Sequence, residues 1–342
     1  MAKKDKAGSP RVDIGGQAVL DGVMMKSPDA VAVAVRRQNG DIVVKRDPYE
    51  SPAKKHKWMG MPFIRGAVSM VQMLGLGMKV LNDSMKMLGE DAAEEEPSKF
   101  EKWLAQKLGK NIDKVVMGVA MVMAVLLSVG LFVLLPNVAV MFFPEKATGG
   151  MLLLKNLVSG IIRILLLIAY ISFCGRIPDM RRTFQYHGSE HKTVYCHEHG
   201  LPLTPENAQQ FSTLHPRCGT SFLLLTFFLS IIFYSIIDVL VLQLTGFDLG
   251  AHYFWRILTR ILLLPCITGI SYEALKGLAH ADTPLVRALR WPGLQMQRLT
   301  TKQPTDAMCE VAIVSMNAAL HGLPEGEVTE EGWVILKKAA EE

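Results

Sequence analysis

Cysteine and charge are both scarce in this chain. Five cysteines among 342 residues offer no disulfide framework of the kind that stabilises small secreted proteins. Charged residues make up 20% of the sequence and hydrophobic residues 50%, and the mean hydropathy is +0.24. This balance excludes an ordinary soluble domain, because so much apolar surface requires a lipid environment. We therefore expect an integral membrane protein.

Two motifs that would suggest other functions or destinations are also lacking. The glycine-rich run Ile14–Met25 has no Gly-Lys-Ser/Thr ending, so it is not a phosphate-binding loop. The charged first residues are followed by no apolar stretch, so we expect no cleaved signal peptide. The glycines at positions 15, 16 and 22 instead predict tight turns or close approach to another surface.

Four apolar runs are long enough to cross a bilayer, which takes about 20 residues. They cover residues 115–143, 151–173, 219–244 and 254–272. The segment 62–88 is interrupted by Arg65, Gln72 and Lys79, so we expect an amphipathic helix that lies at the interface or dips into the membrane. The predicted fold class is mainly α, a multi-pass membrane protein with about four spans, this interfacial helix and a small N-terminal β-hairpin module.

The first 60 residues are predicted to form the β-rich module. Ala30–Arg36 alternates in the manner of a strand, Asn39-Gly40 is a turn signal, and Asp41–Arg46 is again rich in strand-forming residues. The other predicted segments are the interfacial helix 61–90, an acidic linker and basic helix 91–114, spans 115–173, a His-rich loop 174–218, spans 219–272 and a C-terminal region 273–342. Within that last region, 291–301 is expected to be turn-rich and 306–320 to be an amphipathic helix.

The distribution of lysine and arginine predicts an orientation. The short connections 144–150 and 245–253 contain Lys146 as their one lysine or arginine, whereas the long connections and both flanks are basic. Positive residues remain on the cytoplasmic side, so both termini and the 174–218 loop are expected there. Basic residues beside spans favour anionic lipid as a partner, and direct nucleic-acid binding is not expected.

The run His187-Gly-Ser-Glu190-His191 is the clearest indication of chemistry. Residues four apart share a helix face, so His187 and His191 can bind one metal ion while Glu190 serves as a general base. The pattern H-x-x-E-H occurs in inverted zinc proteases. The alternative is that these histidines bind lipid phosphates or backbone groups.

A third ligand is expected from Glu273, His215 or Cys218. Cys218 and His215 stand at the entrance of the third span, and Glu273 stands at the inner end of the fourth. Nitrogen, carboxylate and thiolate ligands together favour zinc. Cys218 is alternatively a nucleophile activated by its helix N-terminus. The nearby Cys196, His197 and His199 are a weaker candidate site and are expected to lie in a solvated loop.

Charged residues inside the predicted spans form a separate group. Asp238 and either Arg256 or Arg260 have compatible depths for an ion pair, and Arg163 has no evident partner. Such residues usually face the interior of a helix bundle. A transport pathway is one interpretation, and packing or contact with lipid headgroups is the other.

Four segments resemble motifs of the YqhQ-like bacterial membrane proteins. They are Gly15–Met25, His187–Thr193, His215–Ser221 and Pro292–Thr301, and with them the resemblance extends from about residue 12 to residue 320. The family is classed as a domain of unknown function and described as predicted metal-dependent enzymes. The resemblance implies a bacterial inner-membrane protein in which His187, Glu190, His191, His215 and Cys218 occupy motif positions.

Two functions follow from these observations. The first is a zinc-dependent hydrolase that acts on a peptide or lipid-linked substrate near the membrane surface, with Glu190 as the general base. The second is a membrane factor without enzymatic activity, whose cytoplasmic platform binds a protein partner such as the translocation or translation apparatus.

Overall fold

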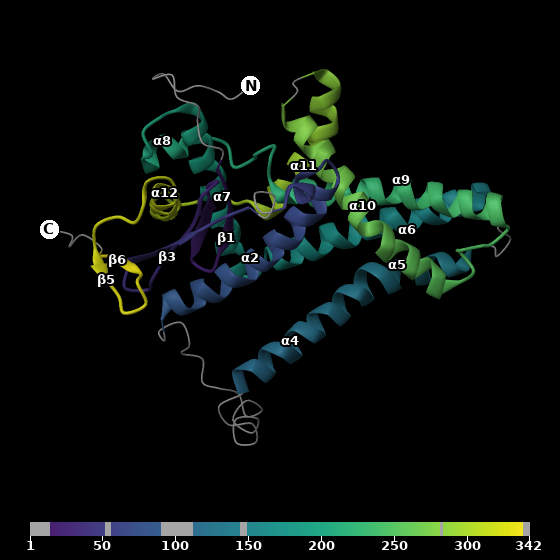
Figure 1. Ribbon diagram of the computed structural model, residues 1–342, viewed down its shortest axis with the longest axis horizontal. Coiled ribbons are helices and arrows are strands. Elements are labelled where there is room, and N and C mark those ends of the chain that lie inside the picture. The colour runs from purple at the N-terminus through teal and green to yellow at the C-terminus, as the bar shows by residue number, and fades with distance from the viewer. Residues whose placement is uncertain (1–13, 52–55, 90–111, 144–148, 281–282, 338–342) are drawn as a thin grey trace. The chain divides into compact units, whose positions relative to one another are not determined.

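The computed structural model describes residues 14–51, 56–89, 112–143, 149–280 and 283–337 (Figure 1). The acidic stretch that follows residue 89, and most of the predicted basic helix, lie outside these residues. Contacts divide the chain into two compact units. The first takes in the N-terminal residues to 92, residues 171–226 and residues from 264 onward, and the second takes in residues 93–170 and 227–263.

The first unit contains a six-stranded antiparallel sheet. Its strands are β1 (Gly15–Val19), β2 (Gly22–Lys26), β3 (Ala30–Arg36), β4 (Ile42–Pro48), β5 (Glu327–Val328) and β6 (Val334–Leu336), in the order β1-β2-β3-β4-β6-β5. The predicted hairpin is confirmed as β3–β4, in which Arg36 pairs with Ile42. The glycine-rich run forms a second hairpin, with Asp21 at a φ of 49° in its turn. Strands β5 and β6 were not predicted from the sequence.

Helices cover both faces of this sheet because its buried strands are apolar on both sides. Val23 and Met25 pack with α7 (Pro178–His199) and α12 (Asp306–His321). Met24 points to the opposite face, where it packs with Val80 and Met87 of α2 (Ile64–Leu88). Successive strand residues point to opposite faces, so a continuous apolar run indicates a strand that is covered twice.

Helix α12 confirms the predicted helix at 306–320. The Thr305 side chain accepts a hydrogen bond from the Met308 amide and caps the helix N-terminus. Met316 is completely buried against the sheet, and the Ser315 hydroxyl donates to the Ala32 carbonyl at 3.1 Å. The C-terminal region therefore packs back onto the N-terminal module.

The connection 174–218 between two predicted spans is largely helical. It contains α7, which agrees with the helix expected around His187 and His191, and the short helix α8 (Pro205–Gln209). Helix α7 has Pro178 in its first turn and ends at Gly200, which has a φ of 66°. Pro and Gly are suited to these two positions, which explains where a helix of such polar sequence begins and ends.

The segment 291–301 was expected to be turn-rich because it contains Pro292-Gly293, and this prediction is wrong. It belongs to α11 (Pro284–Thr300), which continues through both residues. Pro292 is exposed, whereas Gly293 packs so closely against Ser221 that an added Cβ would lie 2.9 Å from the Ser221 hydroxyl. The glycine therefore allows close packing here and does not end the helix.

Five helices in the described part of the chain are long and apolar enough to cross a membrane. They are Ile64–Leu88 (α2), Gly118–Phe142, Gly149–Cys174 (α6), Gly219–Thr245 (α9) and Phe254–Leu278, which belongs to α10 (Tyr253–His280). The stretch Gly118–Phe142 starts within α4 (Ile112–Val129) and includes a π-helical turn and α5 (Leu135–Ala139). Five such helices are typical of a multi-pass membrane protein.

The count differs from the predicted four because α2 also meets the criteria of length and composition. Its interrupting polar residues have partners in the structure. Arg65 pairs with Glu273 at 2.5 Å, the Gln72 amide donates to the Tyr49 hydroxyl at 3.2 Å, and Lys79 pairs with Asp47 at 2.7 Å. These partners remove much of the cost that the polar groups would otherwise have in an apolar setting.

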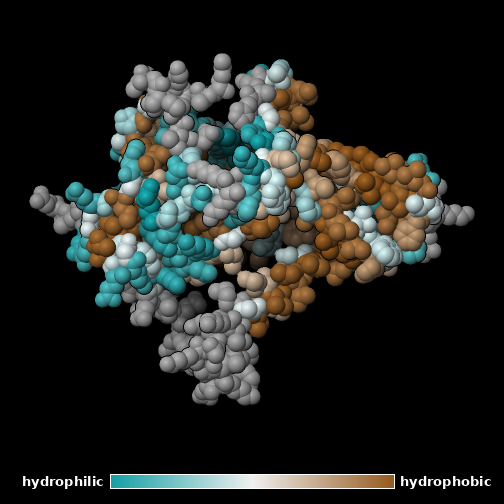
Figure 2. All heavy atoms as spheres, in the orientation of Figure 1, coloured by the Kyte–Doolittle hydropathy of each residue, from teal (hydrophilic) through white to brown (hydrophobic). Residues whose placement is uncertain are grey.

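In the second unit, Figure 2 shows hydrophobic residues gathered over α6 and α9. The two helices approach closely at Gly160, where an added Cβ would lie 2.3 Å from the Ile231 side chain. Small residues permit such close packing between helices in membranes.

Met316→Ala should lower the free energy of unfolding by about 2–5 kcal/mol, because it leaves a cavity between α12 and the sheet. The neighbouring exposed Asn317→Ala is the control and should change it by less than about 0.5 kcal/mol. Thermal unfolding in detergent measures both. Equal unfolding temperatures for the two variants would contradict this packing of α12.

Candidate metal centre

Helix α7 places His187 and His191 side by side. The two residues are one helical turn apart, and their ring centroids lie 4.5 Å from each other. The helix is largely buried between Tyr186 and Cys196, and His191 is only 2% exposed. The spacing in the H-x-x-E-H motif thus brings two imidazoles together in the interior of the first unit.

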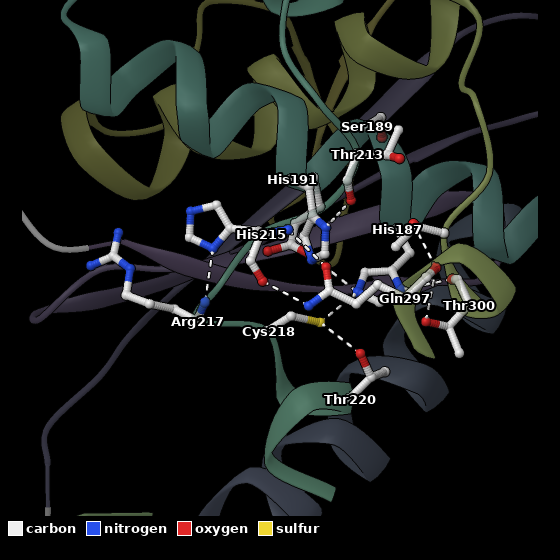
Figure 3. A network of polar contacts seen from close by, with 12 residues as sticks. His187, Ser189, His191, Thr213, His215, Arg217, Cys218, Thr220, Gln297 and Thr300 are labelled. Atoms are coloured by element: carbon white, nitrogen blue, oxygen red, sulfur yellow. Dashed lines mark hydrogen bonds and ion pairs between the residues drawn. The ribbon is translucent and has the colours of Figure 1, made fainter. Parts of the chain in front are cut away.

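Backbone carbonyls hold both imidazoles in one tautomer. His187 Nδ1 lies 2.9 Å from the Thr300 oxygen at the end of α11, and His191 Nδ1 lies 2.5 Å from the Thr213 oxygen (Figure 3). A carbonyl oxygen only accepts hydrogen bonds, so each Nδ1 carries a proton, and Nε2 is the nitrogen that offers a lone pair in the neutral form of each ring. This arrangement is typical of histidines that bind a metal through Nε2.

Cys218 completes a group of three ligand atoms. Its Sγ lies 3.3 Å from His187 Nε2, and the chosen ligand atoms of His187, His191 and Cys218 all lie within 4.8 Å of one another. A tetrahedral zinc ion with ordinary bond lengths would hold such atoms about 3.5 Å apart. The three side chains could therefore hold a metal ion.

Glu190 lies beside this group. Its Oε2 is 3.8 Å from His187 Nε2 and 3.7 Å from His191 Nε2, and the side chain is buried. Burial raises the pKa of Glu190 above its usual value, and the neighbouring His187 and His215 oppose this shift. A carboxyl whose pKa is raised in this way is suited to take up and release a proton.

Strand β1 contacts Glu190 through Gly16. The Gly16 amide donates a hydrogen bond to the Glu190 carboxylate. An added Cβ on Gly16 would lie 2.7 Å from Glu190 Cγ and 2.7 Å from the Met24 oxygen. The N-terminal glycine motif therefore has a packing reason, because only glycine lets β1 approach Glu190 this closely.

Gly188, inside the His-Gly-Ser-Glu-His motif, likewise allows a close approach between two backbone segments. An added Cβ there would lie 2.0 Å from the Lys302 oxygen. The Lys302 amide in turn donates to the Phe184 oxygen at 2.8 Å. The segment that follows α11 is thus held against α7, next to the Thr300 carbonyl that orients His187.

Gln297 on α11 holds the backbone of His215. Its Oε1 accepts from the His215 amide at 2.7 Å, and its Nε2 donates to the His215 oxygen at 2.7 Å and to the Ser221 hydroxyl at 2.8 Å (Figure 3). Gln297 is completely buried, so these bonds are shielded from water. They position the segment that carries both the Thr213 carbonyl and Cys218.

His215 lies next to the three ligands but does not belong to their group. Its ring centroid is 5.7 Å from that of His191, and its Nε2 is 3.4 Å from Oε1 of Glu198. Glu198 also forms an ion pair with Arg217. Burial lowers the pKa of both His215 and His191, so the neutral forms predominate at neutral pH.

Glu273 is not among the ligands, so this prediction from the sequence is not supported by the geometry. Its carboxylate receives two hydrogen bonds from Arg65, at 2.6 and 2.5 Å, and one from the Phe63 amide at 3.4 Å. Membrane depth alone suggested that Glu273 would be near the histidines. Both oxygens of the Glu273 carboxylate are instead bound by Arg65 of α2.

Cys196, His197 and His199 lie in the last turn of α7 and not in a loop. Among the described residues they do not form a group of three that could hold a metal ion. Cys196 is buried with its Sγ 3.4 Å from the Pro202 oxygen, and His199 Nδ1 lies 2.8 Å from the Tyr195 oxygen.

Gln297→Leu should destabilise the protein by about 3 kcal/mol, because the His215 amide and carbonyl would remain buried without partners. Gln295→Leu is the matched control on the same helix; Gln295 is only partly buried, and its change should be small. Thermal unfolding of the detergent-solubilised variants measures the difference. Similar unfolding temperatures for both variants would show that Gln297 does not hold this segment.

Comparison with known proteins places this geometry in a family. A family model described as a protein of unknown function (DUF1385) matches residues 61–322. The chain is also 34% identical over 310 residues to the uncharacterized protein YqhQ of Bacillus subtilis (strain 168), which covers 90% of this chain and 92% of that protein. No solved structure matches. The resemblance noted in the sequence is thereby confirmed, and the chain belongs to the DUF1385 family of YqhQ-like proteins.

Proposed function

We propose that the protein is a zinc-dependent hydrolase of the bacterial inner membrane, with His187, His191 and Cys218 as ligands and Glu190 as the general base. The substrate would be a peptide or lipid-linked molecule presented near the cytoplasmic surface of the membrane. The observation that carries the proposal is the shared tautomer of the two histidines. It directs both Nε2 atoms toward the position where a metal ion would also bind the Cys218 sulfur.

The donor set supports zinc in particular. Two imidazole nitrogens and one thiolate are ligands that zinc prefers, and three protein ligands leave a fourth position for water. A bound zinc ion would lower the pKa of that water to about 7. Thr300 and Thr213 orient the ligand rings through their carbonyls, as partners of metal-bound histidines commonly do.

Glu190 supplies a general base, which a purely structural metal site would not need. Its carboxylate stands within 4 Å of both histidine Nε2 atoms and is shielded from bulk solvent. In hydrolysis it would accept a proton from the attacking water and later donate it to the leaving group. The Gly16 amide would keep the carboxylate in place during both steps.

A second candidate function rests on the short contact between Cys218 and His187. Sγ and Nε2 are 3.3 Å apart, and the Thr300 carbonyl orients the imidazole. A thiol, a base and an orienting group are the elements of covalent catalysis by cysteine. In this alternative His187 takes the thiol proton, and the thiolate attacks a carbonyl carbon of the substrate. The bond from that carbon to its leaving group then breaks, His187 returns the proton to the leaving group, and water hydrolyses the resulting acyl-enzyme.

The surroundings of the site are also part of the proposal. The basic residues beside the predicted spans favour anionic lipid around the protein. The orientation that they predict would place the metal group on the cytoplasmic side. A protein partner on that side remains the alternative in which the group has a structural role only.

The purified protein should contain about one zinc ion per chain. His187→Ala, His191→Ala and Cys218→Ala should each lose most of it, because three ligands are needed for a stable site. His199→Ala, which removes a histidine at the end of the same helix, and Glu273→Gln should retain the wild-type content. Elemental analysis of folded, detergent-purified protein measures this.

A zinc-free wild type that is correctly folded would refute the metal centre. The covalent alternative then predicts rapid alkylation of Cys218 by iodoacetamide, with at least tenfold slowing in His187→Ala. If zinc is bound instead, alkylation should be slow and should accelerate after treatment with a chelator, because metal coordination shields the thiolate.

Glu190→Gln separates a catalytic from a structural metal site. The amide keeps the size of the side chain but cannot act as a base, so the zinc content should stay near the wild-type value. Hydrolysis, or complementation of a deletion strain, should fall by at least a hundredfold. Full complementation by this variant, with zinc still bound, would point to the partner-binding platform.

A further inference from the structure

The second unit contains a cluster of polar side chains within apolar helices. It consists of Asn156 and Arg163 on α6, Asp238 on α9, and Arg256 and Arg260 on α10. Asn156, Asp238 and Arg256 are each at most 5% exposed. None of these residues belongs to the metal group, and the proposed hydrolysis makes no use of them.

Asn156 links the members of this cluster. Its Nδ2 donates to Asp238 Oδ2 at 2.8 Å, and its Oδ1 accepts from Arg256 Nη2 at 3.1 Å and from Arg260 Nη2 at 3.0 Å. Arg260 Nη2 also pairs with Asp238 at 3.2 Å, which agrees with the ion pair expected from the sequence. The cluster is therefore an ordered network that joins three helices.

The charges of this network do not balance. Even without Arg256, the guanidinium groups of Arg163 and Arg260 carry positive charge under all ordinary conditions, and the single carboxylate of the network, Asp238, opposes both. Asp238 is the single acidic residue in the sequence of α6, of α9 and of residues 253–263 of α10. A buried excess of positive charge is costly unless an anion accompanies it.

Several N–H groups of the cluster also have no acceptor among the described residues. They are Nε of Arg163 and both Nε and Nη1 of Arg260, all of which are buried. Buried donors of this kind are rare in folded proteins and usually indicate a bound water or ion. Charge and hydrogen bonding therefore point to the same missing partner, an anion with several acceptor oxygens.

The depth of the arginines indicates where such an anion would come from. Arg256 and Arg260 follow the start of α10 by three and seven residues, which is about 5 and 10 Å along the helix axis. This is the depth of the lipid headgroups and the adjacent hydrocarbon, because the polar zones occupy the outer part of a bilayer about 40–45 Å thick. Arg163 extends the positive region further along α6.

We propose that Arg163, Arg256 and Arg260 form a binding site for one phosphate-type oxyanion, supplied either by a phospholipid headgroup or as free phosphate. The planar guanidinium fork matches the geometry of phosphate oxygens and can donate two parallel hydrogen bonds. Asn156 and Asp238 hold Arg260 in position through its Nη2, which leaves its Nε and Nη1 for the anion.

Arg163→Gln tests the site, because this change removes one guanidinium while leaving the network around Asn156 intact. Lys155→Gln is the matched control, with the same loss of charge on the same helix. Each protein is purified in a phosphorus-free maltoside detergent. Native mass spectrometry then counts retained phospholipid, and thermal unfolding is followed as inorganic phosphate or phosphatidylglycerol is added.

The wild type and Lys155→Gln should retain one phospholipid, or should be stabilised by one of the two additions, and Arg163→Gln should bind at least tenfold more weakly. Stabilisation by inorganic phosphate alone identifies a free anion, and retention or stabilisation specific to phosphatidylglycerol identifies a headgroup. No retained lipid together with no response to either addition in the wild type overturns the proposal, as does equal binding by wild type and Arg163→Gln.

Loss of folding in Arg163→Gln would leave the wild-type measurements decisive, and Arg163→Lys provides a second comparison. Lysine keeps the charge but lacks the planar guanidinium fork. The affinity of Arg163→Lys for the anion should therefore lie between those of the wild type and Arg163→Gln. None of these measurements depends on zinc or on hydrolysis. Failure of the metal centre and failure of the anion site are therefore distinguishable.

Discussion

The burial of a polar helix is the constraint on which the arrangement of the first unit depends. From Tyr186 to Cys196, α7 is largely buried even though it carries histidine, serine, glutamate, lysine and threonine. Polar groups removed from water must find partners inside the protein, or they cost several kcal/mol each. The segments around α7 supply such partners. Lys192, for example, donates to the Gln209 and Phe211 carbonyls at 2.9 and 2.6 Å.

This requirement explains why parts of the chain far apart in sequence meet around α7. The end of α11 provides the Thr300 carbonyl, the segment before α9 provides the Thr213 carbonyl, and β1 provides the Gly16 amide. Each group satisfies one polar side chain of α7 and also restricts its orientation. Satisfaction of buried groups and preorganisation of a site are thus achieved by the same bonds.

In the second unit, some buried polar groups have no hydrogen-bond partner among the described residues. Asn156 accepts hydrogen bonds from Arg256 and Arg260, and Asp238 pairs with Arg260, but buried donors of Arg163 and Arg260 still have no acceptor among the described residues. In an apolar surrounding this residual cost is larger than at a protein surface. The anion that we propose for this cluster would relieve the imbalance, much as a metal ion would engage the ligand atoms that converge in the first unit.

Local patterns in the sequence were sufficient for much of the fold and for half of the candidate site. The alternation around Asn39-Gly40 predicted the β3–β4 hairpin, the apolar spacing predicted α12, and H-x-x-E-H predicted two histidines on one helix face. These features depend on contacts between residues close in sequence, which backbone periodicity determines. The extent of α7 as far as His199 was underestimated because its sequence lacks an apolar stripe, and α2 was judged by its polar residues without their partners.

The sequence by itself thus determined the residue types, their helical spacing and the membrane character of the chain. Only the tertiary structure decided which third residue joins the histidines, because Cys218, His215 and Glu273 were equally compatible with the expected depth. The ion pair with Arg65 engages Glu273, and Gln297 holds the backbone segment that brings Cys218 to the histidines; both contacts join segments at least 80 residues apart. Hydrogen bonds over such sequence separations arise from packing of the whole chain, so no local sequence pattern predicts them.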